Sequence, residues 1–583
     1  MEEPKARRGN LGVPTKTPEG LSSHTLGMLS YERFLTYDDM TTLVHSWAKS
    51  RPDLVELTSI GQSWEGREIW LLTLTNTATG PAPEKPGFLV EANIHAAEIT
   101  GSFAALHLAE RVLTGYGNDE KVTRLLDTRV LYIVPRLNPD GVEHMLEEGR
   151  YIRSSVRPHP LETQEPGLQL RDVDGDGRVL FMRVSDSDGP WKAHPDEPRL
   201  LVRRGPDEYG GDYYRIFQEG EIVGYDGATV RLAEPLECLD LGQNLPTDWG
   251  AAPEVPAHAG PFPGSEPEIQ AMMRAVTDRP NLTGFVTCHT FGGVHLRAPM
   301  NAEDGMPHSD LTVYEEFGAK ATELTGYTAM SFHDLKHQPM YFRGGQLGWY
   351  YNQLGLFSWI TEFWNPLKAV GRKPYHPSMW LVDHPVEDDL ALIRWSDEEL
   401  GGRGFVDWYP FEHPQLGSVE LGGWDMINYW YNPPFDRIEQ EVAPHSEWVI
   451  YLALSSPRVE VRSLTTEQVA PGVHRVQLVV RNSGWLPTNV SARALDRKVS
   501  GFLTVEISLP EYATLLAGEP VRDLGQLDGR VSARSTTTWW GHNPGTPDLA
   551  AAEWLVSAPS GTSVSVTARH PRAGTARAEV DLG

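Results

Sequence analysis

Apolar residues in this chain gather in short, almost unbroken runs, separated by turn signals and by segments with helical spacing. The runs that are apolar nearly throughout lie at 87–93, 130–134, 281–288 and 354–361. A strand without polar alternation is typical of a sheet covered on both faces, as parallel and mixed sheets are. The pattern therefore predicts an α/β fold with helices on both sides of a largely parallel or mixed sheet.

Other elements are predicted around these strands. Helical spacing of apolar residues appears at 31–49, 101–113 and 438–455, and strands at 55–60 and 68–75 are expected to form a hairpin. The segment Pro135-Arg136-Leu137-Asn138-Pro139-Asp140-Gly141 follows the second apolar run and is typical of a turn.

Three changes of composition along the chain predict its domains. Residues 1–27 are rich in Gly, Pro and Thr and are expected to form a flexible tail. Residues 28–455 are expected to form the α/β domain, with an Asp-, Gly- and Pro-rich insertion at 158–239 and a Trp- and Pro-rich surface extension at 366–435. Short alternating strands then predict an all-β sandwich at 456–583.

Composition narrows the class of protein. The 583 residues carry a net charge of −28, which repels phosphate backbones and anionic lipid, so neither nucleic acid nor membrane is an expected partner. Two cysteines provide no disulfide framework, and no apolar run approaches the length of about 18 residues needed for a spanning helix. The N-terminal residues lack the apolar core of a signal peptide, which predicts a cytoplasmic protein, or a secreted one if the N-terminus is truncated.

Polar side chains with metal chemistry follow three of the apolar strands. His95 and Glu98 lie after the first strand, His289 ends another, and Glu362 ends a third. Because the carboxyl ends of strands in an open α/β sheet form the ligand crevice, these side chains are expected to converge there. Two imidazoles, one carboxylate and an open position are the ligand set of zinc in many hydrolytic enzymes.

These residues belong to a longer series of motifs. In chain order the motifs are His95-Ala96-Ala97-Glu98, Asn138-Pro139-Asp140-Gly141, Gly264-Ser265-Glu266-Pro267-Glu268, His289, and Gly344-Gly345 followed by Trp349 and Glu362. With them the chain resembles, over about residues 30–365 apart from the insertion, the zinc carboxypeptidase family of carboxypeptidase A-like metallopeptidases. The match is to a large bacterial-type member with a C-terminal β-sandwich. The resemblance implies a mixed eight-stranded sheet and one Zn²⁺ per chain, bound by His95, Glu98 and His289.

The resemblance also implies an activity. The family's metallocarboxypeptidases hydrolyse a C-terminal peptide bond of a peptide or peptide-like substrate with a zinc-bound water, and Glu362 corresponds to the general base. An arginine from the stretch 150–157 is implied as the group that stabilises the oxyanion. Arg157 is the first choice for this role and Arg153 the second.

The family's clamp for a terminal carboxylate is altered. Its D-x-N-R-N motif reads Asp240-Leu241-Gly242-Gln243-Asn244 here, so the bidentate guanidinium fork is missing. The candidate substrate-binding residues are Gln243, Arg343, Tyr341 and Leu347. Tyr341 is one residue out of register with the family's mobile tyrosine, and Leu347 favours an apolar substrate side chain. The change raises two alternatives: an amidase acting on cell-wall stem peptides or other non-standard amides, and a catalytically inactive relative that binds peptides or glycans.

A short acidic loop lies in the insertion. Asp172, Asp174 and Asp176 alternate with a glycine at the turn, as in calcium loops, but Arg183 occupies the twelfth position and no flanking helices are evident. The sequence allows either a Ca²⁺ ion that stiffens the insertion or a hydrogen-bonded acidic turn without an ion.

Overall fold

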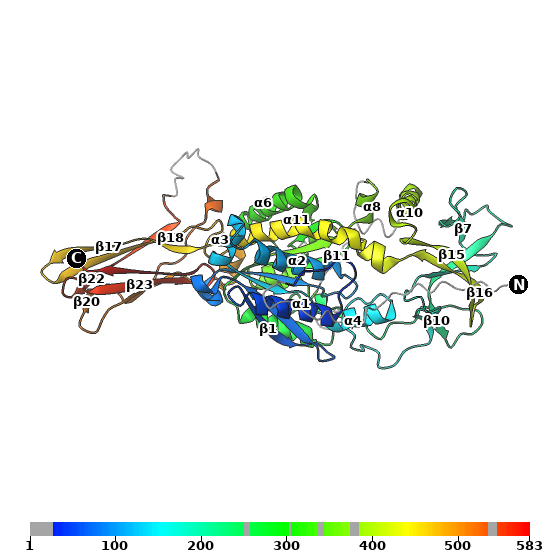
Figure 1. Ribbon diagram of the computed structural model, residues 1–583, viewed down its shortest axis with the longest axis horizontal. Coiled ribbons are helices and arrows are strands. Elements are labelled where there is room, and N and C mark those ends of the chain that lie inside the picture. Colours follow the sequence, from blue (N-terminus) through cyan, green and yellow to red (C-terminus); the bar gives the residue numbers. More distant parts are fainter. Residues whose placement is uncertain (1–26, 250–256, 302–304, 336–342, 373–383, 535–544) are drawn as a thin grey trace.

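The computed structural model describes residues 27–249, 257–301, 305–335, 343–372, 384–534 and 545–583. A central α/β domain lies between two parts that are rich in strands (Figure 1). One of these is the C-terminal region. The other, here called the accessory subdomain, lies at the opposite end and is formed by residues 158–239 and 384–432.

An eight-stranded mixed sheet forms the centre of the α/β domain. In spatial order its strands are β1 (Val55–Gln62), β2 (Glu68–Leu74), β4 (Val130–Val134), β3 (Gly87–Ala92), β11 (Leu282–Thr290), β14 (Phe357–Phe363), β12 (Val294–Arg297) and β13 (Thr328–Ser331). The inner strands β4, β3, β11 and β14 are parallel, so their carboxyl ends lie at one edge. The predicted α/β class and mixed eight-stranded sheet are confirmed.

Helices cover both faces of this sheet. The first face packs against α1 (Tyr37–Ser50), α2 (Thr100–Gly115), α3 (Glu120–Thr128), α6 (His308–Thr325) and α11 (Phe435–Leu454), and the second against α5 (Pro267–Thr277). Along β3, Phe88 and Val90 join the first core while Leu89 joins the second. Since successive side chains point to opposite faces, burial on both sides explains the unbroken apolar run.

Helix α4 (Pro139–Glu148) begins in the segment that was expected to be a turn. The Asn138 side chain accepts a hydrogen bond from the Gly141 N–H at 3.0 Å, and Pro139 is the first helical residue. Asn before a helix and Pro at its first position are start signals, so the turn predicted over 135–141 was wrong from Pro139 onwards. Shorter helical segments are η1 (Thr77–Thr79), η2 (Ala82–Glu84), η3 (Leu241–Gln243), η4 (Ala257–Ala259), α7 (Phe332–Leu335), η6 (Gly348–Gln353), α8 (Pro366–Ala369), η7 (Met426–Tyr431), α12 (Ala492–Asp496) and η8 (Arg530–Ser532).

The accessory subdomain joins two distant parts of the chain. Its six-stranded sheet has the order β15 (Phe405–His413), β16 (Gly417–Trp424), β6 (Phe181–Ser185), β9 (Tyr213–Gln218), β7 (Trp191–Ala193) and β8 (Leu201–Arg203). A separate pair is formed by β5 (Gly167–Leu170) and β10 (Gly220–Val223), and α10 (Val386–Leu400) packs beside the sheet. Strands β6 and β16 pair antiparallel, and Arg183 binds Glu420 across them with contacts of 2.7 and 3.1 Å.

The C-terminal region contains two four-stranded antiparallel sheets around one core. The first sheet comprises β17 (Val459–Ala470), β18 (Val473–Asn482), β22 (Leu549–Ser557) and β20 (Thr514–Ala517), and the second β21 (Val521–Asp523), β19 (Thr504–Ser508), β23 (Ser563–His570) and β24 (Gly574–Asp581). This arrangement confirms the predicted all-β C-terminal fold. Within the described ranges, no helix combines the length and apolar character needed to cross a membrane.

Candidate metal centre and active site

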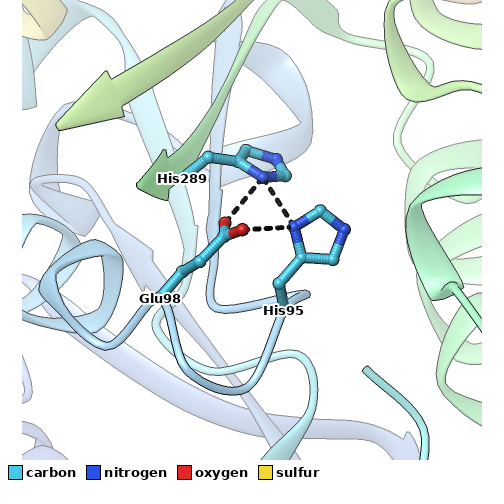
Figure 2. A group of neighbouring side chains, drawn as sticks. All are labelled: His95, Glu98 and His289. Atoms are coloured by element: carbon cyan, nitrogen blue, oxygen red, sulfur yellow. Dashed lines mark hydrogen bonds and ion pairs between the residues drawn. The ribbon is translucent and has the colours of Figure 1, made fainter. Parts of the chain in front are cut away.

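Three predicted metal ligands meet at the carboxyl edge of the central sheet. His95 and Glu98 lie in the turn after β3, and His289 lies near the end of β11. Glu98 Oε1 is 2.9 Å from His95 Nδ1, Glu98 Oε2 is 3.0 Å from His289 Nδ1, and the two Nδ1 atoms are 3.0 Å apart (Figure 2). All three side chains are buried. Such a convergence of two imidazole nitrogens and a carboxylate fits the donor set that zinc prefers.

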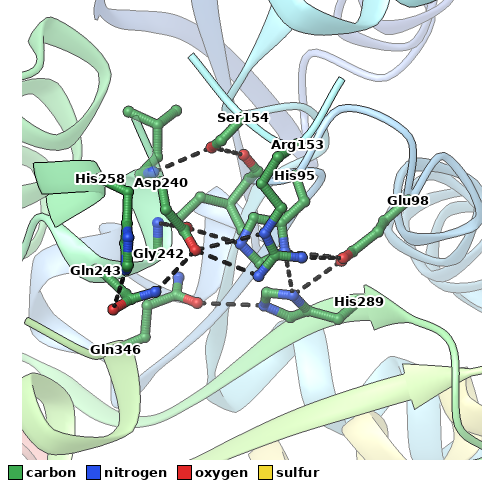
Figure 3. A network of polar contacts seen from close by, with 12 residues as sticks. His95, Glu98, Arg153, Ser154, Asp240, Gly242, Gln243, His258, His289 and Gln346 are labelled. Atoms are coloured by element: carbon green, nitrogen blue, oxygen red, sulfur yellow. Dashed lines mark hydrogen bonds and ion pairs between the residues drawn. The ribbon is translucent and has the colours of Figure 1, made fainter. Parts of the chain in front are cut away.

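Both imidazoles are oriented by groups outside the cluster. His95 Nε2 contacts Asp240 Oδ1 at 3.1 Å, and His289 Nε2 lies 3.2 Å from Gln346 Oε1 (Figure 3). His289 Nε2 also lies 3.0 Å from Thr287 Oγ1. Each ring therefore directs Nδ1 towards the cluster and engages Nε2 elsewhere. Contacts of this kind fix the tautomer and orientation of metal-binding histidines.

Backbone contacts hold the turn that carries His95 and Glu98. Ala96 N–H donates to Arg153 O at 2.9 Å, and Ala97 N–H donates to Ile152 O at 3.2 Å. At the end of β3, Asn93 has a left-handed φ of 58° and donates from Nδ2 to His95 O at 2.6 Å. The stretch around Arg153 is thus bound directly to the turn, which places both at the same site.

Arg153, the second choice from the sequence, reaches the cluster. Its Nη1 donates to Glu98 Oε1 at 2.9 Å, and Nε and Nη2 each lie 3.4 Å from Asp240 Oδ2 (Figure 3). Burial opposes its charge, but the carboxylates of Asp240 and Glu98 outweigh this effect and raise the pKa of Arg153. Its side chain keeps 43% of its surface exposed, so Arg153 is bound to the cluster and still partly accessible to solvent.

Arg157, the first choice, has other partners. Its Nε and Nη2 donate to the two oxygens of Glu266 at 2.9 and 2.6 Å, and its guanidinium lies 5.6 Å from the ring centre of Trp64. Glu266 is fully buried and needs a counter-charge, which explains why it holds this arginine. The structure therefore brings Arg153, and not Arg157, to the metal cluster.

Glu362 lies beside His289 on the neighbouring parallel strand. The two residues are register partners in β14 and β11, so their side chains leave the sheet on the same face. Burial is the main cause that raises the pKa of Glu362 to about 7; the charge of Glu98 raises it further, while His289 and Arg153 lower it. A half-buried carboxyl with this pKa can both accept and release a proton near neutral pH.

The predicted substrate-binding residues occupy different positions. Gln243 donates from Nε2 to Asp240 Oδ2 at 3.0 Å and its Oε1 lies 3.1 Å from His258 Nε2, so it borders the cluster. Arg343 donates from Nη1 to Asp248 O at 3.0 Å. Leu347 is fully buried in a small apolar cluster with Val294, Leu296, Met300 and Ile360. Tyr341 lies outside the described residues.

The acidic loop of the insertion forms a hydrogen-bonded turn. Asp172, Asp174 and Asp176 offer carboxylate oxygens within 4.8 Å of one another. Backbone N–H groups of the loop donate to these carboxylates, Tyr409 OH donates to Asp174 Oδ2 at 2.6 Å, and Arg178 pairs with Asp176. The turn is satisfied by these contacts without an ion, so Ca²⁺ binding stays a prediction.

Three residues near the cluster had no role in the sequence-based prediction. Asp240 orients His95, and Gln346 connects His289 to the fully buried Glu91 through a hydrogen bond from Nε2. The sequence did single out Glu91 as unusual, because it is the one ionisable residue in the apolar run 87–93. Asp240 was part of the altered clamp motif, but its contact with a residue 145 positions earlier has no local signal.

Comparison with known proteins finds similarity to described families in two parts of the chain. Residues 40–176, which include His95 and Glu98, match the family described as zinc carboxypeptidase. This part of the chain is therefore similar to zinc carboxypeptidases. Residues 458–581 match a domain described as of unknown function.

Several curated proteins are similar to part of this chain. Carboxypeptidase D of Drosophila melanogaster is 32% identical over 238 residues, which cover 40% of this chain and 14% of that protein. The zinc carboxypeptidase of Saccharothrix mutabilis subsp. capreolus is 30% identical over 121 residues, which cover 21% of this chain and 28% of that protein. The chain spans less than a third of the length of the curated relatives it matches. Among solved structures, the carboxypeptidase A from Helicoverpa armigera is 18% identical with a TM-score of 0.40, covering 59% of this chain and 67% of the other.

Proposed function

We propose that this protein is a zinc-dependent metallocarboxypeptidase that hydrolyses the C-terminal peptide bond of a peptide substrate. The observation that carries the proposal is the convergence of His95, Glu98 and His289 at a strand edge, with Glu362 adjacent in register. The family match supports the same conclusion.

In this proposal His95 Nδ1, His289 Nδ1 and the carboxylate of Glu98 bind one Zn²⁺. Zinc at this position supplies a Lewis acid that activates water and polarises the substrate carbonyl. Asp240, Thr287 and Gln346 hold the two imidazoles in place through their Nε2 atoms, so little reorganisation is needed on binding.

Glu362 acts as the general base and then as the general acid. Its carboxylate takes a proton from the attacking water and afterwards gives this proton to the nitrogen of the leaving residue. The pKa of about 7 suits both steps, since the ionised and neutral forms are separated by little free energy at neutral pH.

Arg153 stabilises the negative charge that develops on the substrate carbonyl oxygen. Its guanidinium is fixed between Glu98 and Asp240, while the side chain stays partly exposed to solvent. A positive charge held in this way needs little reorganisation when the oxyanion forms. Arg157 is bound to Glu266 and has no part in this proposal.

A second candidate function follows from the altered clamp. Gln243 is bound to Asp240 and His258, and Gly242 has no side chain, so neither offers a guanidinium to a terminal carboxylate. A carbon added at Gly242 would lie 3.0 Å from His95 Nε2, so a larger residue would crowd that imidazole. This observation favours an amidase that accepts amides without a free α-carboxylate.

One set of measurements tests the proposal and its alternatives. Purified protein should contain about one zinc per chain and should release C-terminal residues from a mixed peptide pool, detected by mass spectrometry. Glu362→Gln should keep the zinc and lose activity by several orders of magnitude, because the amide cannot accept the proton.

Peptides with a free or an amidated C-terminus separate the two enzyme functions. Cleavage restricted to free C-termini supports the carboxypeptidase, whereas equal cleavage of amidated copies supports the amidase. Zinc-loaded protein that cleaves neither set would refute both and leave the inactive binding relative.

A further inference from the structure

The accessory subdomain contacts the turn that carries two of the proposed zinc ligands. Asn432, at the end of η7, is fully buried and donates from Nδ2 to Ala97 O at 2.8 Å. Its Oδ1 accepts hydrogen bonds from Thr100 N–H at 3.0 Å and from Thr100 Oγ1 at 2.8 Å. One side chain therefore binds the middle of the His95–Glu98 turn and the start of α2. Residues adjacent to Asn432 have a fixed position relative to the metal cluster.

Tyr431, the residue before Asn432, forms part of an aromatic wall. Its ring centre lies 4.9 Å from that of Tyr151 and 5.4 Å from that of Phe291, and it stands nearly perpendicular to Phe291 at 88°. All three rings are half-buried, so each keeps a solvent-facing part. They come from three separate places: η7, the stretch before Arg153, and the loop after β11.

The wall lies on one defined side of Arg153. Phe291 follows Thr290, whose N–H donates to Glu98 Oε2 at 3.2 Å, and the charge of Glu98 adds to burial in raising the pKa of Tyr151 and of Tyr431. Gln243 and His258 lie on the other side, since Gln243 is bound to Asp240. Arg153 bonds to both carboxylates and therefore lies between the two sides.

We propose that Tyr431, with Tyr151 and Phe291, determines specificity by binding an apolar or aromatic side chain on the acyl side of the scissile bond. The inference rests on the proposed peptidase function. It takes the leaving residue to lie towards Gln243, because Gln243 belongs to the altered clamp motif, and the acyl side to lie towards Glu98. Aromatic faces attract apolar and aromatic groups through burial and through stacked or edge-on contacts. The accessory subdomain thereby completes the substrate cleft of the zinc carboxypeptidase domain.

The test compares two peptides that differ only in the penultimate residue, Phe or Gly, and share the same C-terminal residue. Wild type should prefer the Phe peptide, and Tyr431→Ala should reduce the ratio of kcat/KM values by roughly 10- to 100-fold. Tyr431→Phe should keep the ratio, because the ring rather than the hydroxyl makes the contact. Tyr209→Ala is the matched control, since Tyr209 is an accessory-subdomain tyrosine that is 80% exposed.

Zinc content and activity on the Gly peptide show whether each variant is intact. If Tyr431→Ala fails to bind zinc normally, Tyr431→Gln replaces it, because glutamine keeps much of the side-chain length but removes the apolar ring. An unchanged Phe-to-Gly ratio in a zinc-loaded variant would overturn the inference while leaving the peptidase function standing. Zinc-loaded wild type that cleaves neither peptide, nor any in the mixed pool, would instead overturn the proposed function.

Discussion

Single residues around the metal cluster are fixed by buried carboxylates. Glu98, Asp240 and Glu266 are each buried and each binds an arginine, Arg153 for the first two and Arg157 for the third. A buried carboxylate without a counter-charge is strongly unfavourable, so these pairs decide where each guanidinium lies. The choice between the two arginines depends on which carboxylates become buried, and this follows from the fold rather than from spacing.

Replacing the two arginines separately should give different losses. Arg153→Ala should lower kcat/KM by about 100- to 1,000-fold, because the proposed oxyanion loses its positive partner. Arg157→Ala should lower the free energy of unfolding by about 3–5 kcal/mol, because buried Glu266 loses its partner, while the folded enzyme keeps near-normal activity. Steady-state kinetics and denaturant unfolding of both variants check this. Reversed effects would return the catalytic assignment to Arg157.

A second residue-scale prediction concerns pH. Burial lowers the pKa of His295 to about 3, and its ring nitrogens lie 3.1 Å from Thr361 Oγ1 and 3.0 Å from Thr325 Oγ1. The neutral ring is kept in the folded state, whereas the unfolded chain binds a proton below about pH 6.5. The contribution of His295 to the free energy of unfolding is fully present above about pH 6.5. It is lost as pH falls towards 3, by up to about 1.4 kcal/mol per pH unit.

Unfolding measured from pH 7 to pH 4 tests this linkage. His295→Gln should reduce the slope of the unfolding free energy against pH by an amount that corresponds to close to one bound proton. His308→Gln, at an exposed histidine, should leave this slope unchanged. Identical slopes in wild type and His295→Gln would show that this ring does not stay neutral in the folded protein.

At the scale of elements, the end of η7 and the metal-binding turn form one unit. Asn432 satisfies the Ala97 carbonyl and the Thr100 N–H at the start of α2, which would otherwise be buried without partners. We regard Asn432 as a positioning residue, since it acts on the cluster through the turn.

Removing that side chain should loosen the cluster. Asn432→Ala should lower the free energy of unfolding by about 2–4 kcal/mol and weaken zinc binding about 10- to 100-fold. Competition with a chelator gives the zinc affinity, and Asn428→Ala is the control because Asn428 bonds within η7 to Asp425. Reduced stability with unaltered zinc affinity would limit Asn432 to a structural role.

Much at this scale was predictable from the sequence. Unbroken apolar runs gave β3, β4, β11 and β14, because burial on both faces removes polar alternation. Strand-end positions then indicated that His95, Glu98, His289 and Glu362 converge. The orienting contacts from Asp240 and Gln346 were not predictable, because they join residues far apart in the chain and depend on side-chain direction.

At the scale of the molecule, the C-terminal sandwich is docked by buried polar contacts. Asp310 on α6 accepts hydrogen bonds from Ala492 N–H at 2.8 Å, Arg493 N–H at 3.0 Å and Tyr351 OH at 2.9 Å. Asp310 is 2% exposed, so this carboxylate joins α12 to the central domain in a site closed to water.

Loss of this carboxylate should release the sandwich. Asp310→Ala should make the region after residue 455 more sensitive to limited proteolysis and should lower the melting temperature, because two backbone N–H groups lose a buried acceptor. Glu316→Ala is a matched control on the same helix, since its pair with Arg534 is exposed and contributes little. Equal proteolysis of the two variants would contradict a docking role for Asp310.

The alternation of apolar and polar residues after residue 456 was enough to indicate a β-sandwich. The sequence did not show that the insertion at 158–239 and the extension at 366–435 pair in one sheet. The pairing of β6 with β16 joins strands more than two hundred residues apart, and their short, half-polar sequences contain no local sign of the partner. Long-range pairing of this kind is decided by the assembled fold.

The β6–β16 pairing has a consequence for biosynthesis. As the polypeptide leaves the ribosome, β6 emerges long before β16, so the sheet between them has an open edge until most of the chain has been made. The Asn432 contact with the metal-binding turn forms later still, because Asn432 lies beyond β16. In a nascent chain the proposed metal site therefore becomes fully ordered only after residue 432 has emerged, which delays the proposed peptidase activity until then.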